Sequence, residues 1–240
     1  MNYKKGNIAM LNYIFYSIIS LSIIAQTNYI NALGEAVPYA LLKKILPANP
    51  TIIEAGAQFG EDTQWMSQMW PAGKIYSFEP SPESFTALQE VASKNHNVSA
   101  TQCALSNTKG EFVFYLAGGA SSLLRPQDSF NTDYFHSDLD HPITVEVITL
   151  DEWTKDNNVK IIDFMWLDME GNELNALQGA LNSLKNVKLI YTEVNLQRFW
   201  QHCVMYDELT TWMNNHGFIE IWSDITPDWH GNVLFINTNI

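Results

Sequence analysis

The stretch TIIEAGAQFGE, Thr51 to Glu61, decides how the rest of the chain is interpreted. It begins with an apolar run, turns at Gly56, and continues into a polar segment that can be helical. A buried strand that passes through a glycine turn into a helix is the usual cradle for a nucleotide-like ligand. Glycine allows the tight turn and a close approach of the backbone, and the free N–H groups of the helix N-terminus face the ligand.

A second apolar run, Lys74 to Phe78, ends in Glu79, which lies about 20 residues beyond the glycine turn. A carboxylate at this position is placed to accept hydrogen bonds from ribose hydroxyls. Gly56 and Gly60 do not complete the pattern G-x-G-x-x-G, because Gln58 fills the place where a second glycine would admit a pyrophosphate. A ligand without a pyrophosphate, such as S-adenosylmethionine, therefore fits this turn better than a dinucleotide does.

Glu54 would suit the ammonium or sulfonium end of that ligand. The alternative is an ordinary tight strand-to-helix turn, which any α/β domain can contain.

Length and composition favour one globular α/β domain. The chain has 240 residues, of which 46% are hydrophobic and 12% aromatic, enough to bury a sizeable core. A formal net charge of −13 argues against a nucleic-acid partner, because phosphate binding needs basic patches. The two cysteines, Cys103 and Cys203, indicate neither a disulfide framework nor a metal site.

The N-terminus differs from the rest. Lys4 and Lys5 precede a largely apolar run from Ile8 to Ala25, which is typical of a signal peptide or a membrane anchor. A buried or amphipathic helix is the alternative. We therefore predict a leader or anchor over residues 1–31, with membrane association through it, and a catalytic domain over residues 32–240. Such a segment indicates an anchored or exported protein, whereas dependence on S-adenosylmethionine places the catalytic domain in the cytoplasm.

Two later strands carry acidic residues at their carboxyl ends. The apolar run Ile161 to Leu167 is typical of a central parallel strand, and the run Val187 to Val194 predicts its neighbour. Because ligands bind beyond the carboxyl ends of the strands in open α/β sheets, Asp168, Glu170 and Glu193 are expected at the site. The alternative for Glu170, and also for the nearby Glu173, is capping of the following helix.

The stretch from Ser121 to Pro142 is long, polar and without periodicity, which is typical of a lid or substrate loop. It contains four side chains that can bind metals, namely His136, Asp138, Asp140 and His141. A solvated acidic loop is the favoured interpretation, so we predict no metal site. Beyond it, two closing strands, Phe218 to Trp222 and Val233 to Ile236, indicate an antiparallel pair.

Taken together, several blocks resemble the FkbM family of S-adenosylmethionine-dependent methyltransferases, over nearly all of the chain beyond the N-terminal run. EAGAQFG resembles the family's glycine turn, YSFEPSPESF its second-strand block, and IDFMWLDMEGNELNALQGA its signature I-D-x-x-K-x-D-x-E-G-x-E-x-x-x-L-x-G-A. CALSNTKGEFVFY, GASSL and TLDEW match further blocks in the same order. Two departures stand out: Gln58 replaces an Asn, and Trp166 replaces the signature Lys, which bears on substrate or activity.

The resemblance implies a class I methyltransferase fold: a Rossmann-like, mostly parallel seven-stranded sheet with an antiparallel C-terminal strand and helices on both faces. It implies methyl transfer to a hydroxyl of a small molecule, such as a sugar or natural product, or of a glycan. We expect Asp168 nearest the methyl group, and Glu170 or Glu193 orienting or deprotonating the acceptor. The expected cofactor contacts are Glu54, Gly56, Ala57, Gly60, Glu79, Pro80, Ala104, Leu105 and Asp168.

Two other functions remain open from the sequence. One is a non-catalytic module that binds S-adenosylmethionine or a nucleoside, with Trp166 marking lost activity. The other is a nicotinamide-dependent oxidoreductase, against which the missing middle glycine counts.

Overall fold

The computed structural model describes residues 38–127 and 138–240. The predicted leader or anchor over residues 1–31 lies outside these ranges, as do His136 and the side chains of Asp138 and Asp140. No helix within the described ranges is long and apolar enough to cross a membrane. The helices, with two short 3₁₀ turns, are α2 (Tyr39–Ile45), α3 (Glu61–Met69), α4 (Pro82–Lys94), η1 (Gly118–Ala120), α6 (Leu150–Asp156), α7 (Glu173–Gln178), η2 (Ser183–Asn186) and α8 (Tyr206–Asn215).

The strands form two sheets. They are β1 (Thr51–Ala55), β2 (Lys74–Phe78), β3 (Val98–Thr101), β4 (Ala104–Leu105), β5 (Gly110–Leu116), β6 (Asp138–Ile148), β7 (Ile162–Leu167), β8 (Val187–Asn195), β9 (Phe218–Ile225) and β10 (His230–Asn237).

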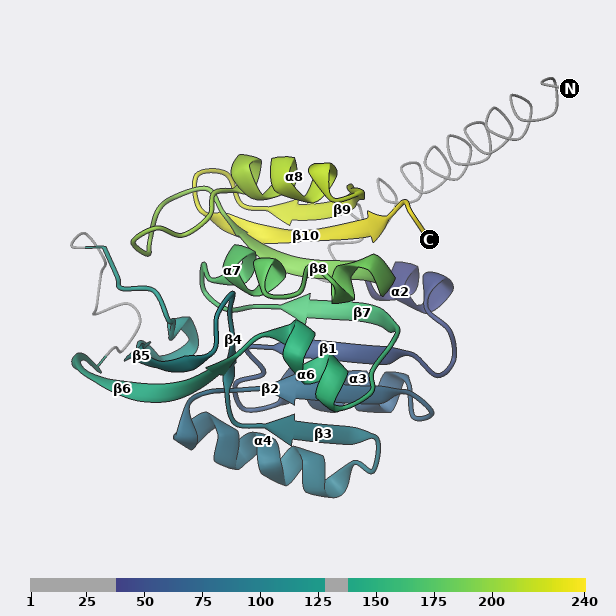
Figure 1. The fold of residues 1–240 in the computed structure, drawn as a ribbon, viewed down its shortest axis with the longest axis horizontal. Coiled ribbons are helices and arrows are strands. Elements are labelled where there is room, and N and C mark those ends of the chain that lie inside the picture. The colour runs from purple at the N-terminus through teal and green to yellow at the C-terminus, as the bar shows by residue number, and fades with distance from the viewer. Residues whose placement is uncertain (1–37, 128–137) are drawn as a thin grey trace, which may run out of the picture.

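The main sheet has seven strands in the order β3-β2-β1-β7-β8-β10-β9 (Figure 1). Strands β3, β2, β1, β7 and β8 pair in parallel, while β10 runs antiparallel to both of its neighbours. The C-terminal strand thus inserts between β8 and β9, with Val233 opposite Thr192. This confirms the predicted mostly parallel sheet with an antiparallel C-terminal strand.

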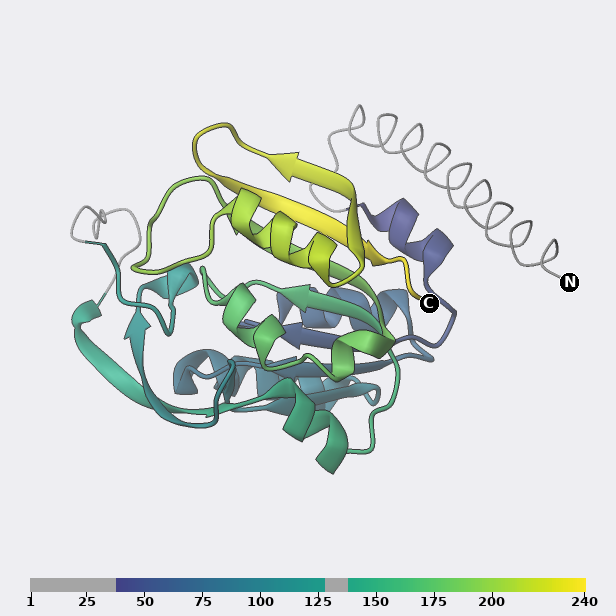
Figure 2. The ribbon, with the colours of Figure 1, turned by 45° about the horizontal axis from the view of Figure 1, so that its top comes forward.

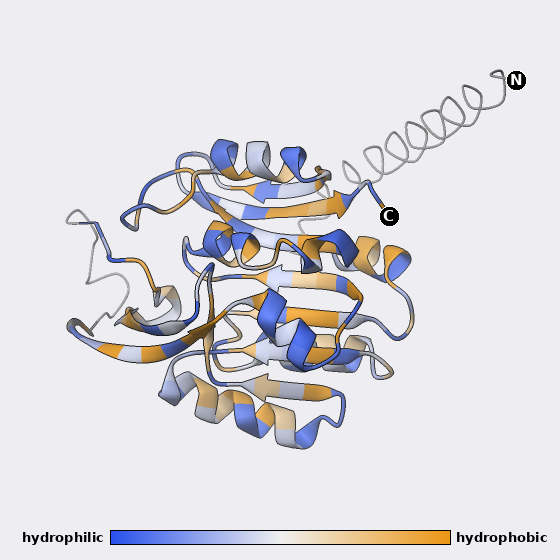
Figure 3. Ribbon diagram, in the orientation of Figure 1, coloured by the Kyte–Doolittle hydropathy of each residue, from blue (hydrophilic) through white to orange (hydrophobic). Residues whose placement is uncertain are grey.

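Helices cover both faces of this sheet (Figures 1 and 2). Successive side chains of β1 point to opposite faces, so Ile52 and Ile53 enter different cores. Ile53 packs in the core that α7 and α8 cover, whereas Ile52 packs in the core that α2 and α3 cover. Figure 3 shows the same division, with apolar colour on the central strands and polar colour over much of α6 and α8. Because these strands are buried on both faces, their sequences are nearly continuous apolar runs.

A separate three-stranded sheet, in the order β4-β6-β5, lies beside the carboxyl edge of the main sheet (Figure 1). The prediction of a loop as far as Pro142 was wrong at its C-terminal end, because β6 already begins at Asp138. The pairing of β6 with β5 is irregular between Phe114 and Leu116, opposite the stretch that contains the proline. Proline cannot donate to a strand ladder and is tolerated at such irregularities, so a pattern broken at Pro142 concealed the strand.

Candidate functional site

A pocket of about 620 Å³, counted with its opening to solvent, lies at the carboxyl edge of the main sheet. Its walls come from the turn after β1, the end of β2, β4, the η1 segment and the turn after β7. The predicted site residues that line it are Gly56, Glu79, Pro80, Ala104, Leu105, Asp168 and Glu170. Seven residues that lie in four separate regions of the sequence thus meet in one cavity.

The turn after β1 packs tightly against the end of β7. A Cβ atom on Gly56 would lie 1.7 Å from the backbone oxygen of Asp168, and the φ of Gly56 is +85°. The N–H groups of Gly56 and Ala57 both donate to the carbonyl of Phe78, at 3.0 and 3.1 Å. Gly56 is therefore needed for the approach of two backbone segments, in addition to its place in the pocket wall.

Glu79 is held in a fixed orientation at the end of β2. Glu79 is 5% exposed, and its carboxylate accepts hydrogen bonds from the N–H of Gln58 at 2.9 Å and of Ser81 at 2.8 Å. Burial raises the pKa of Glu79, and the two N–H donors oppose that rise. A carboxylate offers about four lone-pair positions, so about two remain for hydroxyl donors such as those of a ribose.

Gln58 occupies the left-handed region with a φ of +47°. Asn adopts this region more readily than other non-glycine residues, which gives a conformational reason for the Asn in the related motif.

Three predicted cofactor contacts, Glu54, Gly60 and Ala57, are not among the described residues that line the pocket. Each of them stabilises the fold behind the pocket wall. Glu54 is 1% exposed and accepts hydrogen bonds from the hydroxyls of Thr63 and Ser77. Burial raises the pKa of Glu54 to about 7, although both hydroxyls act to lower it. Gly60 is the residue directly before α3 and has a φ of +87°, and a Cβ there would lie 3.0 Å from a side-chain atom of Val91.

The third of these residues, Ala57, packs against α4 in a small core with Phe85 and Leu88. The sequence could not separate these residues from true pocket residues, because all three lie in or beside the same glycine turn.

The three predicted catalytic residues come together. One carboxylate oxygen from each of Asp168, Glu170 and Glu193 lies within 4.8 Å of the other two. Asp168 is exposed to the open pocket while protein encloses its other sides. This enclosure, followed by the charges of Glu193 and Glu173, raises the pKa of Asp168 well above its usual value. Burial and the charge of Glu193 raise the pKa of Glu170 in the same way.

Glu170 reaches this cluster through an unusual backbone conformation. Its φ is +55°, which is uncommon for a residue other than glycine. The hydroxyl of Ser122 donates to its carbonyl at 2.9 Å, and the indole of Trp200 hydrogen-bonds to its carboxylate. The structure thus fixes Glu170 from the η1 side and from the loop between β8 and α8.

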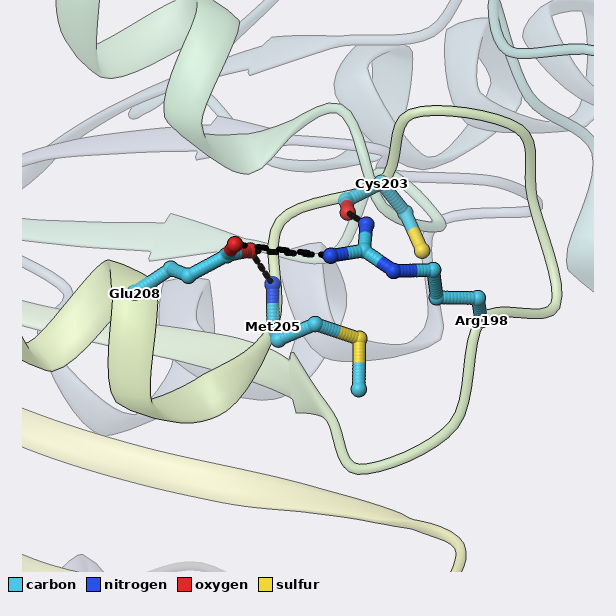
Figure 4. A network of polar contacts seen from close by, with 4 residues as sticks. All are labelled: Arg198, Cys203, Met205 and Glu208. Atoms are coloured by element: carbon cyan, nitrogen blue, oxygen red, sulfur yellow. Dashed lines mark hydrogen bonds and ion pairs between the residues drawn. The ribbon is translucent and has the colours of Figure 1, made fainter.

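The loop between β8 and α8 is itself tied down (Figure 4). Arg198 donates to the carbonyl of Cys203 at 2.8 Å and lies 3.4 Å from the carboxylate of Glu208. Glu208 in turn accepts from the N–H of Met205 at 3.0 Å. This network holds the segment that carries Trp200 against the turn after β7, where the Cβ of Cys203 would lie 2.7 Å from a Cβ on Gly171.

Glu173 holds the turn after β7. The alternative predicted for it, capping of the following helix, was wrong, because α7 has no side-chain cap hydrogen bond. Its Oε1 accepts from the N–H groups of Met169 at 2.9 Å and Gly171 at 3.2 Å. Burial raises the pKa of Glu173 to about 8. Glu170, by contrast, faces the pocket, so the two glutamates of this turn have different places.

His230 is a site residue that the sequence did not indicate. Its Nδ1 lies 2.8 Å from Oε1 of Glu193, and this contact raises the pKa of His230. His230 stands opposite Asn195 in the antiparallel pair of β10 and β8. A register between strands that are distant in sequence decides this contact, so no local signal could have revealed it.

The pocket wall also includes Gly118, Gly119 and Ser121, to which the sequence assigned no role. The sequence offered one signal for them: Gly118 and Gly119, the second of which begins the GASSL block, form a double glycine after a strand. Such glycines mark a place where another segment or a ligand approaches the backbone closely.

Trp166, which stands where the related signature has Lys, lies outside the pocket wall given by the described residues. It is 6% exposed, and its ring centroid is 4.5 Å from that of Tyr191. It lies beside Glu54 in the pairing of β7 with β1. The replacement therefore changes the core under α2 and α3.

Comparisons with known proteins agree with this geometry. The 2-O-methyltransferase NoeI of Sinorhizobium fredii is 26% identical over 161 residues, which cover 64% of this chain and 66% of that protein. The hexuronic acid methyltransferase AglP of Haloferax volcanii is 24% identical over 125 residues, 50% of this chain and 47% of that protein. The chain thus spans about half to two thirds of the length of these two relatives.

Among solved structures, the fibrillarin pre-rRNA processing protein of Methanococcus jannaschii has a TM-score of 0.50 and 14% identity. The match covers 84% of this chain and 74% of that one, and it shows a shared fold. The model of the methyltransferase FkbM domain matches residues 54–220, which include the end of β1, the turn after β7 and the start of β9. This chain belongs to the FkbM methyltransferase family.

Proposed function

We propose that this protein is an S-adenosylmethionine-dependent O-methyltransferase that acts on a hydroxyl of a sugar, a glycan or a natural product. The observation that carries the proposal is one pocket that joins Glu79, which is suited to ribose hydroxyls, with the carboxylates of Asp168 and Glu170. Family membership supports the cofactor. The names of the relatives, a 2-O-methyltransferase and a hexuronic acid methyltransferase, support a sugar hydroxyl as acceptor.

The residues of the pocket fit the cofactor. Glu79 retains acceptor positions for a ribose, and Ala104 and Leu105 offer a small apolar wall that suits an adenine ring. When bound, S-adenosylmethionine supplies an electrophilic methyl group on a cationic sulfur. The negative charge of the Asp168 carboxylate favours a cation at this end of the pocket.

The protein's main task in such a reaction is to align two reactants away from water. The acceptor oxygen forms a bond to the methyl carbon while the bond from that carbon to sulfur breaks, and S-adenosylhomocysteine leaves. The hydroxyl proton passes to Glu170 or Glu193, which lie within 4.8 Å of each other and of Asp168. A carboxyl group whose pKa is raised, as burial does for Glu170, is once ionised a stronger base than a free carboxylate.

Calorimetry with the purified chain tests the cofactor directly. We expect S-adenosylmethionine to bind and NADH not to bind. Binding of NADH alone would favour an oxidoreductase and contradict the proposal.

Transfer of tritiated methyl groups into cell extract, followed by identification of the product, then tests the reaction. Wild-type protein should label a compound that Asp168→Asn protein labels at least tenfold more slowly. Cofactor binding without any labelling would leave a non-catalytic binding module as the better interpretation.

We also propose that residues 1–31 serve as a leader or anchor for a methyltransferase domain over residues 32–240 that works in the cytoplasm, where S-adenosylmethionine is available. N-terminal sequencing of native protein, together with fractionation of cells, tests this division. A mature N-terminus near residue 31 in an exported fraction would overturn the cytoplasmic location.

A further inference from the structure

The acidic cluster of Asp168, Glu170 and Glu193 brings three carboxylates close together, and its hydrogen bonds do not compensate their combined negative charge. Three carboxylates supply oxygens within 4.8 Å of one another. Like charges at such distances repel strongly, so a cluster of this kind is stable only if protons or a cation compensate the charge. His230 lies beside Glu193 and can compensate one charge at most.

Glu193 supplies a second and independent observation. It is 8% exposed, and its Oε1 contacts His230 at 2.8 Å. Within residues 38–127 and 138–240, its other oxygen, Oε2, is buried and has no hydrogen-bond partner. A buried carboxylate oxygen without a partner carries a substantial desolvation cost, which a bound ligand would remove. This oxygen belongs to the carboxylate that stands beside Asp168 and Glu170.

The spacing of the three carboxylates fits one hard cation. At metal–oxygen distances of about 2.0–2.1 Å, oxygens around Mg²⁺ lie about 3 Å apart when adjacent and about 4.2 Å apart when opposite. Around Ca²⁺, at about 2.3–2.6 Å, opposite oxygens reach about 5 Å. The observed limit of 4.8 Å lies within the Ca²⁺ range and exceeds the Mg²⁺ limit by about 0.6 Å, which a small movement of the three side chains onto the ion would remove. Carboxylate, rather than thiolate or imidazole, is the ligand type that such ions prefer.

The surroundings also resemble those of a metal ligand. A side chain that binds a metal is usually oriented by a further hydrogen bond, and His230 provides one to Glu193. The indole of Trp200 does the same for Glu170. Asp168 is exposed and lines the pocket, so an ion bound there would be accessible from the pocket.

We propose that Asp168, Glu170 and Glu193 bind one divalent cation, Mg²⁺ or Mn²⁺, at the acceptor end of the pocket. Three protein oxygens leave about three positions of an octahedral ion open. Oxygens of the acceptor can occupy these positions, which favours a substrate with two neighbouring hydroxyls or a hydroxyl beside a carboxylate. An ion so placed would lower the pKa of a bound hydroxyl. With the ion bound, the three carboxylates would act as ligands, and the hydroxyl proton would leave to solvent water in place of the transfer to Glu170 or Glu193 that applies to the site without an ion.

The role in catalysis rests on the proposed methyl transfer, but the binding of the ion does not. The test therefore measures binding. Full-length protein is stripped with a chelator and titrated with Mn²⁺, and free Mn²⁺ is followed by electron paramagnetic resonance. We expect one Mn²⁺ per chain, which Mg²⁺ displaces, and a melting temperature that rises with Mn²⁺ concentration.

Two variants locate the ion. Glu193→Gln and Asp168→Asn each remove one charged ligand with little change of shape, and each should weaken Mn²⁺ binding at least tenfold. Glu90→Gln is the matched control, since Glu90 lies exposed on α4 beside Lys94 and undergoes the same change of charge. The control should bind Mn²⁺ as the wild type does. Circular dichroism of each variant verifies that it is folded.

Several results would overturn the cation site. One is the absence of Mn²⁺ binding, and another is equal affinity in the wild type and both cluster variants. A third is displacement of Mn²⁺ by S-adenosylmethionine, which would make the cluster a counter-charge for the cofactor. Calorimetry with S-adenosylmethionine in the presence of chelator separates the two proposals: cofactor binding without Mn²⁺ binding rejects the ion alone, and the reverse rejects the methyltransferase alone.

Discussion

At the scale of single residues, the glycine turn combines two requirements that look alike in the sequence. Gly56 lies in the pocket wall and also permits the end of β7 to approach the turn, with only 1.7 Å available for a Cβ. Gly119 lies in the same wall, yet a Cβ there would meet only the amide of Gln58, at 3.4 Å. The two glycines therefore offer a direct comparison of packing with ligand contact.

Gly56→Ala should destabilise the protein by more than about 3 kcal/mol, because the new methyl group overlaps backbone and the φ of +85° is strained for alanine. Gly119→Ala should cost less than about 1 kcal/mol. Urea denaturation of both variants measures the difference. Similar stabilities for the two would contradict the close approach of the turn to Asp168.

Glu79 connects stability with ligand binding in another way. Glu79→Ala leaves the buried N–H groups of Gln58 and Ser81 without their acceptor, which should cost about 1–3 kcal/mol of stability. It should also weaken binding of S-adenosylmethionine about tenfold or more, since hydrogen bonds to a charged group are lost.

Calorimetry and denaturation measure these two effects separately. Glu83→Ala, on the exposed side of α4, is the control and should change neither. Unchanged cofactor affinity in folded Glu79→Ala protein would contradict the ribose assignment.

At the scale of elements, β1 and β7 carry the site at their carboxyl ends and the core along their lengths. Glu54 of β1 lies beside Trp166 of β7, on the face that α2 and α3 cover. Trp166 joins Tyr191 and Trp222 in a series of aromatic contacts across that face. A lysine at position 166 would place a positive charge near the buried Glu54 carboxylate. In this chain, tryptophan at that position makes aromatic contacts and supplies no such charge.

Trp166→Ala should therefore reduce the free energy of unfolding by about 3–5 kcal/mol, as expected when a large aromatic side chain is removed from a core. Binding of S-adenosylmethionine to the folded fraction should stay the same, because Trp166 lies outside the pocket wall of the described residues. Ile161→Ala is the control: its side chain is 63% exposed, and its loss should cost little. A large loss of cofactor affinity with intact stability would place Trp166 in the site after all.

At the scale of the whole molecule, several buried carboxyl groups give the protein an unusual dependence on pH. The pKa of Glu54 is raised to about 7 and that of Glu173 to about 8, and burial is the main cause for both. Their pKa values in the unfolded chain lie near 4.5. Between these limits the folded state binds more protons than the unfolded state does, so stability falls as pH rises.

We therefore expect the free energy of unfolding, measured with chelator present, to fall from about pH 5 to about pH 8. Glu54 alone contributes on the order of 3 kcal/mol to this change, since each pKa unit corresponds to about 1.4 kcal/mol. Glu54→Gln should flatten the profile between pH 5 and 7, whereas the exposed Glu90→Gln should leave it unaltered. A profile that rises with pH would show that these groups are ionised in the folded protein.

Much of this molecule followed from local patterns. The apolar runs at β1, β2, β7 and β8 predicted parallel strands, because strands buried on both faces must be apolar throughout. The acidic residues directly after those runs predicted one site, because the carboxyl ends of parallel strands meet at one edge. Asp168 and Glu170 lie in the pocket for this reason, and Glu193 stands beside them.

Other features depend on contacts between segments that are far apart in the chain. Strand β6 begins at Asp138 because β5 supplies a partner there, with Leu116 opposite Asp138, although the first residues of β6 are polar and interrupted by proline. The sequence grouped Glu54 and Gly60 with the pocket, and packing against α3 and α4 placed them behind its wall.

The contacts of His230 with Glu193 and of Trp200 with Glu170 likewise come from strand register and loop packing. The sequence by itself determined the fold, the family and the edge of the sheet that carries the site, since each depends on the order of short local patterns. Only the tertiary structure decided that the carboxylates of Asp168, Glu170 and Glu193 lie close together. It also decided that one oxygen of Glu193 is buried without a hydrogen-bond partner among the described residues. Distance and burial set the energy of charges, and a linear pattern specifies neither.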